Sequence, residues 1–281
     1  MNFLTSTFKA KMKRAIVTLT AITNLLLFST RLFAQLAADG NYYTSFDNTK
    51  IYYEVKGDGY PVILLHGFSG TSQGWKSGEM YNDLLKAGYK VIILDMRGNG
   101  KSDKPHIDAG YSNDAEAKDI IGLATELKLK NYDAVGYSRG SIILSRLLVL
   151  DKRLHKAVMG GMGDAYTNPE WPRRVHAYKA LMGDTSLHDV DDMVKYIHSQ
   201  PFDVLALALQ QKWQPSTSKK ELAAVKIPVL IIRGTSDMEN GSETGLNKMM
   251  PRSELMYVPG NHNTASRNTE FSAAVLGFLK N

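Results

Sequence analysis

Short runs of β-branched and other apolar residues alternate, along residues 35–281, with longer segments whose apolar positions recur at helical spacing. Glycine, proline or aspartate bounds each short run, as is typical of strands. The predicted strands are Tyr42–Phe46, Lys50–Val55, Pro61–His66, Lys90–Asp95, Tyr132–Tyr137, Lys156–Gly161, Pro228–Arg233 and Glu254–Val258. Eight strands are enough for one large sheet.

The pattern within these runs indicates how the strands are arranged. Residues 62–65 and 229–232 are apolar at every position, which is typical of strands that helices cover on both faces. The first two strands are joined by Asp47-Asn48-Thr49, turn residues that suit an antiparallel hairpin. Segment 112–128 is the clearest amphipathic helix, and Ser112 or Asn113 can cap it. We therefore predict an α/β fold with a mainly parallel, doubly wound sheet, whose functional residues follow the strands.

One segment departs from this alternation. From Asp164 to Ile227 there are 64 residues with no clear strand pattern. Helical periodicity predicts helices at Trp171–Met182, Asp189–Ser199 and Phe202–Trp213. We expect residues 164–227 to form a small helical cap insertion over the carboxyl edge of the sheet, and residues 35–163 and 228–281 to form the core.

Cysteine content and charge exclude several classes of function. The chain of 281 residues has no cysteine, which removes disulfides, a thiol nucleophile and cysteine-based metal sites. A net charge of +6 is typical of proteins that bind nucleic acid, but most of this charge lies at the amino terminus. Residues 1–34 carry five basic and no acidic residues. The remaining 247 residues have 29 basic and 28 acidic side chains, so no basic stripe is left for a phosphate backbone and no nucleic-acid partner is expected.

Residues 1–34 have the layout of an export signal. A basic stretch, Lys9 to Arg14, precedes an apolar run of 14 residues from Ala15 to Phe28, which is shorter than the ~20 residues that span a bilayer. We expect cleavage near Ala34 and an exported protein, periplasmic or secreted, without a stable membrane anchor. Retention as an uncleaved anchor is the alternative, since Arg31 and Phe33 lie close to the expected cut.

Gly136-Tyr137-Ser138-Arg139-Gly140 follows an apolar predicted strand and precedes a helix at Ser141–Leu150. In that context a serine on a sharp strand-to-helix turn is a candidate nucleophile, because the flanking glycines let the neighbouring backbone pass closely. The helix dipole also favours an oxyanion there. The alternative is a buried serine in a tight turn.

A serine needs a base, and the chain has seven histidines. His262 directly follows the last predicted strand and can reach the carboxyl edge of the sheet, so it is the preferred base. His66 ends an early strand and is assigned a supporting role between loops. The others lie in charged, helical or polar surroundings and are expected at the surface or in packing: His106, His155, His176, His188 and His198.

A carboxylate must orient the histidine, and Asp237 is the preferred candidate because it lies just past the strand Pro228–Arg233. Asp164, just past the preceding strand, is the alternative. The oxyanion would be held by two backbone N–H groups, those of Arg139, after the serine, and Phe68, in the glycine-rich loop His66-Gly67-Phe68-Ser69-Gly70. A simple glycine-rich turn remains the alternative for that loop.

Together these segments, from about Tyr42 to Lys280, resemble the α/β-hydrolase superfamily. The segment from Asp95 to Asp103 (DMRGNGKSD) also looks like the family's structural run after its fourth strand. The resemblance implies the α/β-hydrolase fold, an eight-stranded sheet with helices on both faces, and a cap. Serine at 138 argues against haloalkane dehalogenases and epoxide hydrolases, which place aspartate there. Asn261, where the family often has glycine, and the missing proline after Asp237 are departures that concern loop geometry.

The expected function is that of a serine hydrolase without cofactor or metal, acting on a small-molecule ester through an acyl-enzyme. Trp75, Trp171 and Trp213 are candidates to line an apolar substrate pocket, although core packing is the alternative for each. C–C bond hydrolysis of the β-diketone type and perhydrolysis stay open on the same fold, as does a non-catalytic hydrolase-like binding module. Oligomeric state is open.

Overall fold

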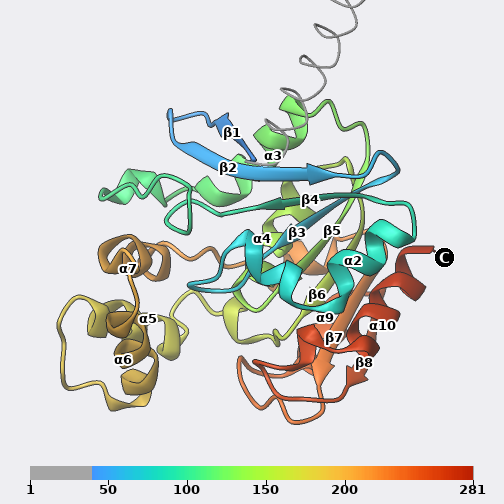
Figure 1. The fold of residues 1–281 in the computed structure, drawn as a ribbon. Helices are drawn as coiled ribbons and strands as arrows, with labels where there is room; N and C mark the ends of the chain where they lie inside the picture. Colours follow the sequence, from blue (N-terminus) through green and yellow to red (C-terminus); the bar gives the residue numbers. More distant parts are fainter. Residues whose placement is uncertain (1–39, 281) are drawn as a thin grey trace, which may run out of the picture. The chain divides into compact units, whose positions relative to one another are not determined.

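An eight-stranded sheet forms the centre of the fold in the order β1-β2-β4-β3-β5-β6-β7-β8 (Figure 1). The computed structural model describes residues 40–280, so the expected export segment, residues 1–34, lies outside the described residues. The strands are β1 (Asn41–Thr44), β2 (Lys50–Lys56), β3 (Pro61–Leu65), β4 (Lys90–Leu94), β5 (Tyr132–Tyr137), β6 (Leu154–Gly160), β7 (Val229–Gly234) and β8 (Ser253–Val258). All eight strands predicted from the sequence are confirmed, with shifts of a few residues at their ends.

The sheet is mainly parallel, as predicted. β2 pairs with β4 in antiparallel orientation, and every pairing from β4 through β3, β5, β6 and β7 to β8 is parallel. β1 is the neighbour of β2, and the turn between them is closed by a hydrogen bond from Ser45 N to Thr49 O of 2.9 Å. The carboxyl ends of β3 and β5 to β8 therefore meet at one edge of the sheet.

Helices cover both faces, and this explains why the central strands are apolar at every position. On β3, Ile63 and Leu65 pack with the helices of one face, while Val62 and Leu64 pack with those of the other. The first face is covered by α3 (Ala115–Glu126), α4 (Arg139–Leu150), α8 (Lys219–Ala223) and α9 (Glu243–Met249). The second is covered by α2 (Glu79–Lys86) and α10 (Thr269–Lys280).

The chain between β6 and β7 forms helices in the places where the sequence periodicity predicts them. Figure 1 shows α5 (Pro172–Leu181), α6 (Asp191–Ser199) and α7 (Val204–Lys212) grouped beside the sheet. They bury a cluster of their own, which we call the cap cluster: Leu181, Ile197, Leu207 and Ala208. The sequence reasoning missed α8, which brings Leu222 back to the main core.

The start of α3 differs from the prediction. Asp114, rather than Ser112 or Asn113, is the residue before the helix, and no side chain caps it. Asn113 and Asp114 both have left-handed backbones, with φ of 56° and 59°. The Asp114 carboxylate instead binds the Arg146 guanidinium at 3.0 Å, so a contact with α4 takes the place of a local cap.

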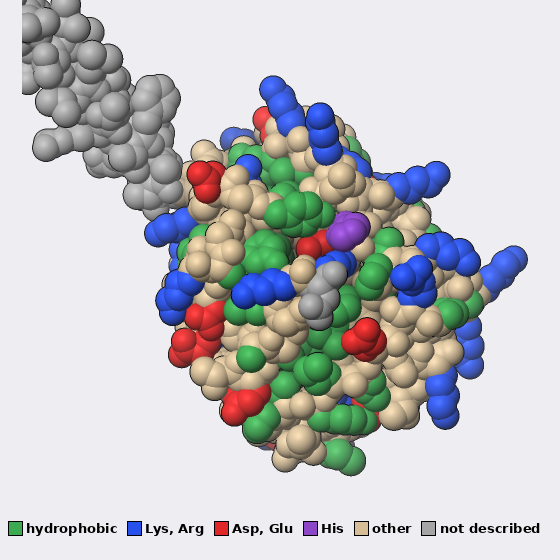
Figure 2. Space-filling view, turned by 90° about the vertical axis from the view of Figure 1, so that its right-hand side faces the viewer, with side chains coloured by type: hydrophobic (Ala, Val, Ile, Leu, Met, Phe, Trp, Pro, Cys, Tyr) green, Lys and Arg blue, Asp and Glu red, His purple; other side chains and the backbone are tan. Residues whose placement is uncertain are grey.

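Figure 2 shows the face on the right of Figure 1, toward α10, where lysine, arginine, aspartate and glutamate side chains are interspersed among apolar ones. Within residues 40–280, every helix is too short or too polar to cross a bilayer.

Candidate active site

Ser138 lies on a strained turn between β5 and α4. Its backbone has φ 53° and ψ −123°, a conformation that costs a non-glycine residue of the order of 1–3 kcal/mol. Small neighbours make the turn possible, since a Cβ on Gly136 would lie 2.5 Å from the carbonyl oxygen of Gly140. The hydrogen bond from Ser138 N to Gly160 O, 2.8 Å, fixes the turn to β6. The serine hydroxyl is thereby presented at the start of α4.

The structure brings Ser138, His262 and Asp237 into one chain of contacts. His262 Nε2 lies 2.9 Å from Ser138 Oγ, and His262 Nδ1 lies 2.9 Å from Asp237 Oδ2. The three residues follow β5, β8 and β7, which end at the same edge of the sheet. The geometry has Nδ1–H donating to the carboxylate, so Nε2 is left to accept a proton from the serine.

Asp237 is held as an ion. Its side chain is fully buried, and burial alone would raise its pKa. The hydrogen bond from His262, the hydrogen bond from Glu239 N at 3.0 Å and the charge of Arg233 outweigh this, so the pKa of Asp237 lies below its ordinary value. The carboxylate therefore faces the imidazole in its charged form at neutral pH.

Arg233 supports the Asp237 loop, and the sequence reasoning did not single it out. Its guanidinium is buried and donates to three backbone carbonyls, those of Asp237 (2.7 Å), Glu239 (2.6 Å) and Gly241 (2.8 Å). The signal in the sequence is an arginine that ends an otherwise apolar buried strand. The loop that presents Asp237 is thus fixed from within.

Asp164, the alternative carboxylate, is engaged elsewhere. Its Oδ1 accepts a hydrogen bond from the backbone N–H of Ser242 at 2.8 Å, at the start of α9. The structure therefore gives Asp164 a loop-bracing contact, whereas the contact with His262 belongs to Asp237.

The glycine-rich loop after β3 lies against Ser138. A Cβ on Gly67 would be 3.3 Å from Ser138 Cβ, so only a glycine allows this approach without displacement. Within residues 40–280, the Phe68 N–H donates to no protein acceptor, as expected of an amide that is free for a ligand. Arg139 is the first residue of α4, where backbone N–H groups have no intrahelical partner.

His66 ties two loops together, in line with the supporting role expected of it. Its Nδ1 donates to Gly67 O at 2.8 Å, and its Nε2 accepts from Met96 N at 3.0 Å. Burial lowers the pKa of His66, so the ring is neutral in the tautomer that these two contacts require.

The run from Asp95 to Asp103 braces the same region. Asp95 accepts hydrogen bonds from the backbone N–H groups of Ser72 (2.6 Å) and Lys101 (2.8 Å). Arg97 is fully buried and forms ion pairs with Asp119 (2.6 Å) and Asp47 (2.8 Å). The contact between Asp95 and Ser72 joins the loops after β3 and β4, and Arg97 ties the second of these loops to α3 and to the turn between β1 and β2.

The three tryptophans expected around the substrate are not brought together. Trp75 is buried in the cluster under α2 and α10, and Trp171 packs against the cluster on the other face. Trp213 is 37% exposed and donates from Nε1 to Asp108 at 2.7 Å. Hydrophobicity alone does not separate a pocket residue from a packing residue.

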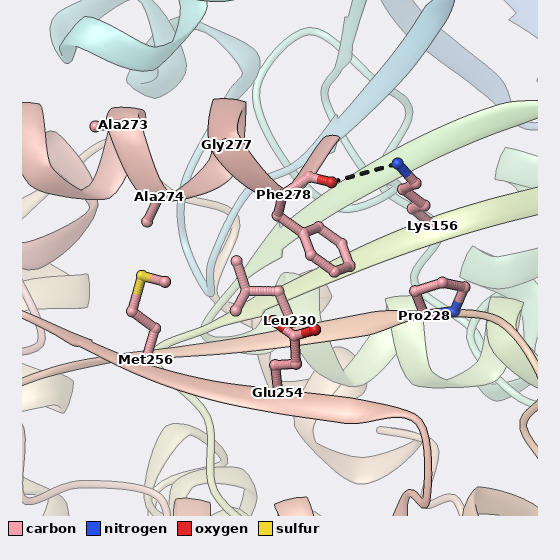
Figure 3. Close-up of a pocket in the computed structure, with 9 residues that line it drawn as sticks. All are labelled: Lys156, Pro228, Leu230, Glu254, Met256, Ala273, Ala274, Gly277 and Phe278. Carbon is pink, nitrogen blue, oxygen red and sulfur yellow. Dashed lines mark hydrogen bonds between the residues drawn. The ribbon is translucent and has the colours of Figure 1, made fainter. Parts of the chain in front are cut away.

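A cavity of about 410 Å³ lies away from this site, between α10 and the sheet (Figure 3). It opens near the amino ends of the strands, at Lys156, Pro228 and Glu254, whereas Ser138 and His262 follow carboxyl ends.

Residues 40–280 contain no group of three or more His, Asp or Glu side chains placed to hold a metal ion.

Comparison with known proteins agrees with this fold. A family model described as the alpha/beta hydrolase fold matches residues 60–187. A non-heme haloperoxidase of Rhodococcus erythropolis is 26% identical over 279 residues, which cover 84% of this chain and 98% of the relative.

Solved structures give the same result. The esterase of Exiguobacterium antarcticum superposes with a TM-score of 0.71 at 22% identity, covering 86% of this chain and all of the esterase. The bromoperoxidase of Bacillus anthracis does so with a TM-score of 0.67 at 26% identity, again over 86% of this chain and all of the other. With its mainly parallel sheet, its strand-to-helix turn at Ser138 and these relatives, the chain belongs to the α/β-hydrolase superfamily.

Proposed function

We propose that this protein is a serine hydrolase that cleaves a carboxylic ester of a small, partly apolar substrate, with Ser138 as nucleophile. The observation that carries the proposal is the uninterrupted contact from Ser138 Oγ through His262 to the buried Asp237. A serine hydroxyl, an imidazole and a carboxylate in this order supply a nucleophile, a general base and a group that stabilises the imidazolium.

In the acylation step, Ser138 Oγ attacks the ester carbonyl carbon while His262 Nε2 takes the hydroxyl proton. The negative charge that develops on the carbonyl oxygen is stabilised by the N–H groups of Phe68 and Arg139. When the tetrahedral intermediate collapses, His262 returns the proton to the departing alcohol. The acyl group remains on Ser138.

In the deacylation step, water replaces the alcohol. His262 takes a proton from the water as it attacks the acyl-enzyme, and the second tetrahedral intermediate uses the same two amides. Collapse releases the acid and restores the Ser138 hydroxyl. Asp237 stays ionised throughout, which its lowered pKa supports.

The proposal is tested by labelling with a fluorophosphonate and locating the modified peptide. We expect label on Ser138, and we expect Ser138→Ala to lose both labelling and hydrolysis of short acyl esters while it stays folded. Ser145→Ala is the matched control, because Ser145 is a fully buried serine on the same helix whose hydroxyl contacts Ile142 O and Thr217, away from the turn. Retention of most activity in Ser138→Ala would refute the assignment.

A second candidate is perhydrolysis, which the haloperoxidase relatives favour. Here hydrogen peroxide, in place of water, attacks the acyl-enzyme, so that a peracid leaves and the Ser138 hydroxyl is restored. The test measures peracid formation from a short carboxylic ester with hydrogen peroxide. A rate that disappears in Ser138→Ala supports it, and ester hydrolysis without peracid formation argues for hydrolysis alone.

We also propose that the protein is exported, with removal of residues 1–34. The basic, apolar and small-residue order of that segment supports this. Amino-terminal sequencing of the full chain after expression in a host with a secretion pathway tests it. A mature chain that begins at Gln35 is expected, and an intact amino terminus in the cytosolic fraction would contradict it.

A further inference from the structure

Cap helix α7 is linked to the side chains of both residues whose amides face the oxyanion in the proposed mechanism, through the cap cluster for Phe68 and through a hydrogen bond for Arg139. The first contact is apolar. Phe68 is half-buried and packs against the cap cluster, which includes Leu207 and Ala208 of α7. The Phe68 backbone N–H is the proposed donor, while its side chain is held by the cap.

The second contact is polar and concerns Arg139. Its guanidinium binds the Glu116 carboxylate, with Nη1 2.7 Å from Oε1, and both side chains are 3% exposed. Nη2 also donates to the backbone carbonyl of Gln210, on α7, at 3.3 Å. The residue after the nucleophile is thus linked to the same helix as Phe68.

Helix α7 is itself firmly placed. Gln210 is fully buried, and its Nε2 donates to Arg97 O at 2.7 Å, in the loop after β4. Leu207 and Gln210 are three residues apart, so they lie on neighbouring positions of one helix face. The α7 side chain in the cap cluster and the α7 carbonyl that accepts from Arg139 therefore lie on adjacent turns of one buried helix.

Residues 104–111, which we call the strap, hold both ends of this helix. At the beginning, His106 Nε2 lies 2.8 Å from Asp203 Oδ2, and Asp203 caps α7. At the end, Asp108 accepts hydrogen bonds from Lys212 Nζ (2.9 Å) and Trp213 Nε1 (2.7 Å). A helix fixed at its middle and at both ends can set the distance between the Phe68 loop, which packs against the cap cluster, and the start of α4, which it contacts.

We propose that α7 positions the oxyanion hole, with Leu207 and Gln210 as positioning residues that act through Phe68 and Arg139. This inference rests on the proposed function, since it assigns the two amides their role there. An oxyanion donor misplaced by a fraction of an ångström loses much of its effect on the transition state but little of its effect on the ground state. Loss of cap packing should therefore lower kcat and leave KM nearly unchanged.

The test is a double-mutant cycle between Leu207→Ala and Phe68→Leu, read out as kcat, KM and the rate of fluorophosphonate labelling of the full chain. Each single variant is expected to lower kcat and the labelling rate together, by about 10- to 100-fold, with KM within about threefold. The double variant should lose no more than the worse single one. Leu207→Met should restore most of the rate. Met182→Ala, which truncates a 53% exposed methionine of the cap, is the control expected to match the wild type.

The outcomes separate the two proposals. A wild-type protein that the fluorophosphonate does not label refutes the serine mechanism. A labelled wild type, with Leu207→Ala or Phe68→Leu at the wild-type kcat, leaves that mechanism standing and overturns the role of α7. Effects that add in the double variant, or that appear in KM alone, overturn it as well. Should Leu207→Ala fail to fold, Phe68→Leu decides, because its backbone amide is retained.

Discussion

The hydroxyl of Tyr137 donates a hydrogen bond of 2.7 Å to the backbone carbonyl of His262. Tyr137 directly precedes Ser138, so the residue next to the proposed nucleophile also holds the loop of the proposed base. The Tyr137 ring lies 5.5 Å from the His262 ring and 5.8 Å from that of Phe271, centre to centre. The distance between Ser138 and His262 is thus set partly through their neighbours.

We predict that Tyr137→Phe lowers kcat by about tenfold and stability by about 1 kcal/mol, since it removes a hydrogen bond and keeps the ring packing. Steady-state kinetics and urea unfolding measure both. Tyr111→Phe is the matched control for stability, because the buried Tyr111 hydroxyl has no hydrogen-bond partner within residues 40–280. Equal losses of stability in the two variants would contradict the role of the His262 contact.

Asp237→Asn is predicted to reduce kcat by about four orders of magnitude, because an amide cannot stabilise the imidazolium and favours the wrong tautomer. Asp164→Asn should have little effect on the rate, since an amide oxygen can still accept the hydrogen bond from Ser242 N. Ester hydrolysis at neutral pH measures the ranking. A larger loss in Asp164→Asn would transfer the role to that residue.

His66 should make stability fall as the pH falls. Burial lowers its pKa in the folded state, so below the ordinary histidine value, about 6.5, the unfolded chain binds a proton that the folded chain does not. The contribution of His66 to the free energy of unfolding is complete above pH 6.5 and is lost as the pH falls toward the pKa of the folded state. The free energy of unfolding falls by at most about 1.4 kcal/mol per pH unit in this range.

The measurement is the free energy of unfolding between pH 7 and pH 5 for the wild type and His66→Gln, whose amide oxygen can accept from Met96 N. The difference between the two profiles isolates His66 from other titrating groups. A wild-type profile that parallels that of the variant would show that His66 does not contribute.

Arg139→Met is predicted to destabilise the fold by about 3–5 kcal/mol, because it leaves the Glu116 carboxylate buried without its partner. Replacing both, Arg139→Met with Glu116→Met, should recover most of that loss, since two apolar side chains of similar volume remove both charges. Chemical denaturation measures the four proteins. A double variant no more stable than Arg139→Met would contradict the uncompensated charge as the cause.

The fold and the chain of contacts at Ser138 could be predicted because they depend on local patterns. β-branched runs place the strands, and in a parallel sheet residues after different strands meet at one edge, so Ser138, Asp237 and His262 could be expected there. Asp237 could be preferred over Asp164, but Asp164 could not be excluded from the sequence, because both follow strands. Its exclusion depends on a contact between Asp164 and Ser242 that only the folded loops create.

Positions that depend on long-range side-chain contacts could not be predicted. Arg233 and Tyr137 lie in strand sequences, and nothing local indicates that their polar groups reach the loops of Asp237 and His262. The tryptophans show the converse, since large apolar side chains are as suitable for the core, where Trp75 lies, as for a pocket. The N-cap of α3 was also predicted wrongly because of a long-range contact, since the Asp114 side chain binds Arg146 on α4.

The strap binds α7 at its first and its last turn, and this limits how α7 can move. Either α7 leaves the core together with residues 104–111, or the contacts at Asp203 and Asp108 must break at the same time. The helix and the strap should therefore exchange their amide hydrogens as one cooperative unit.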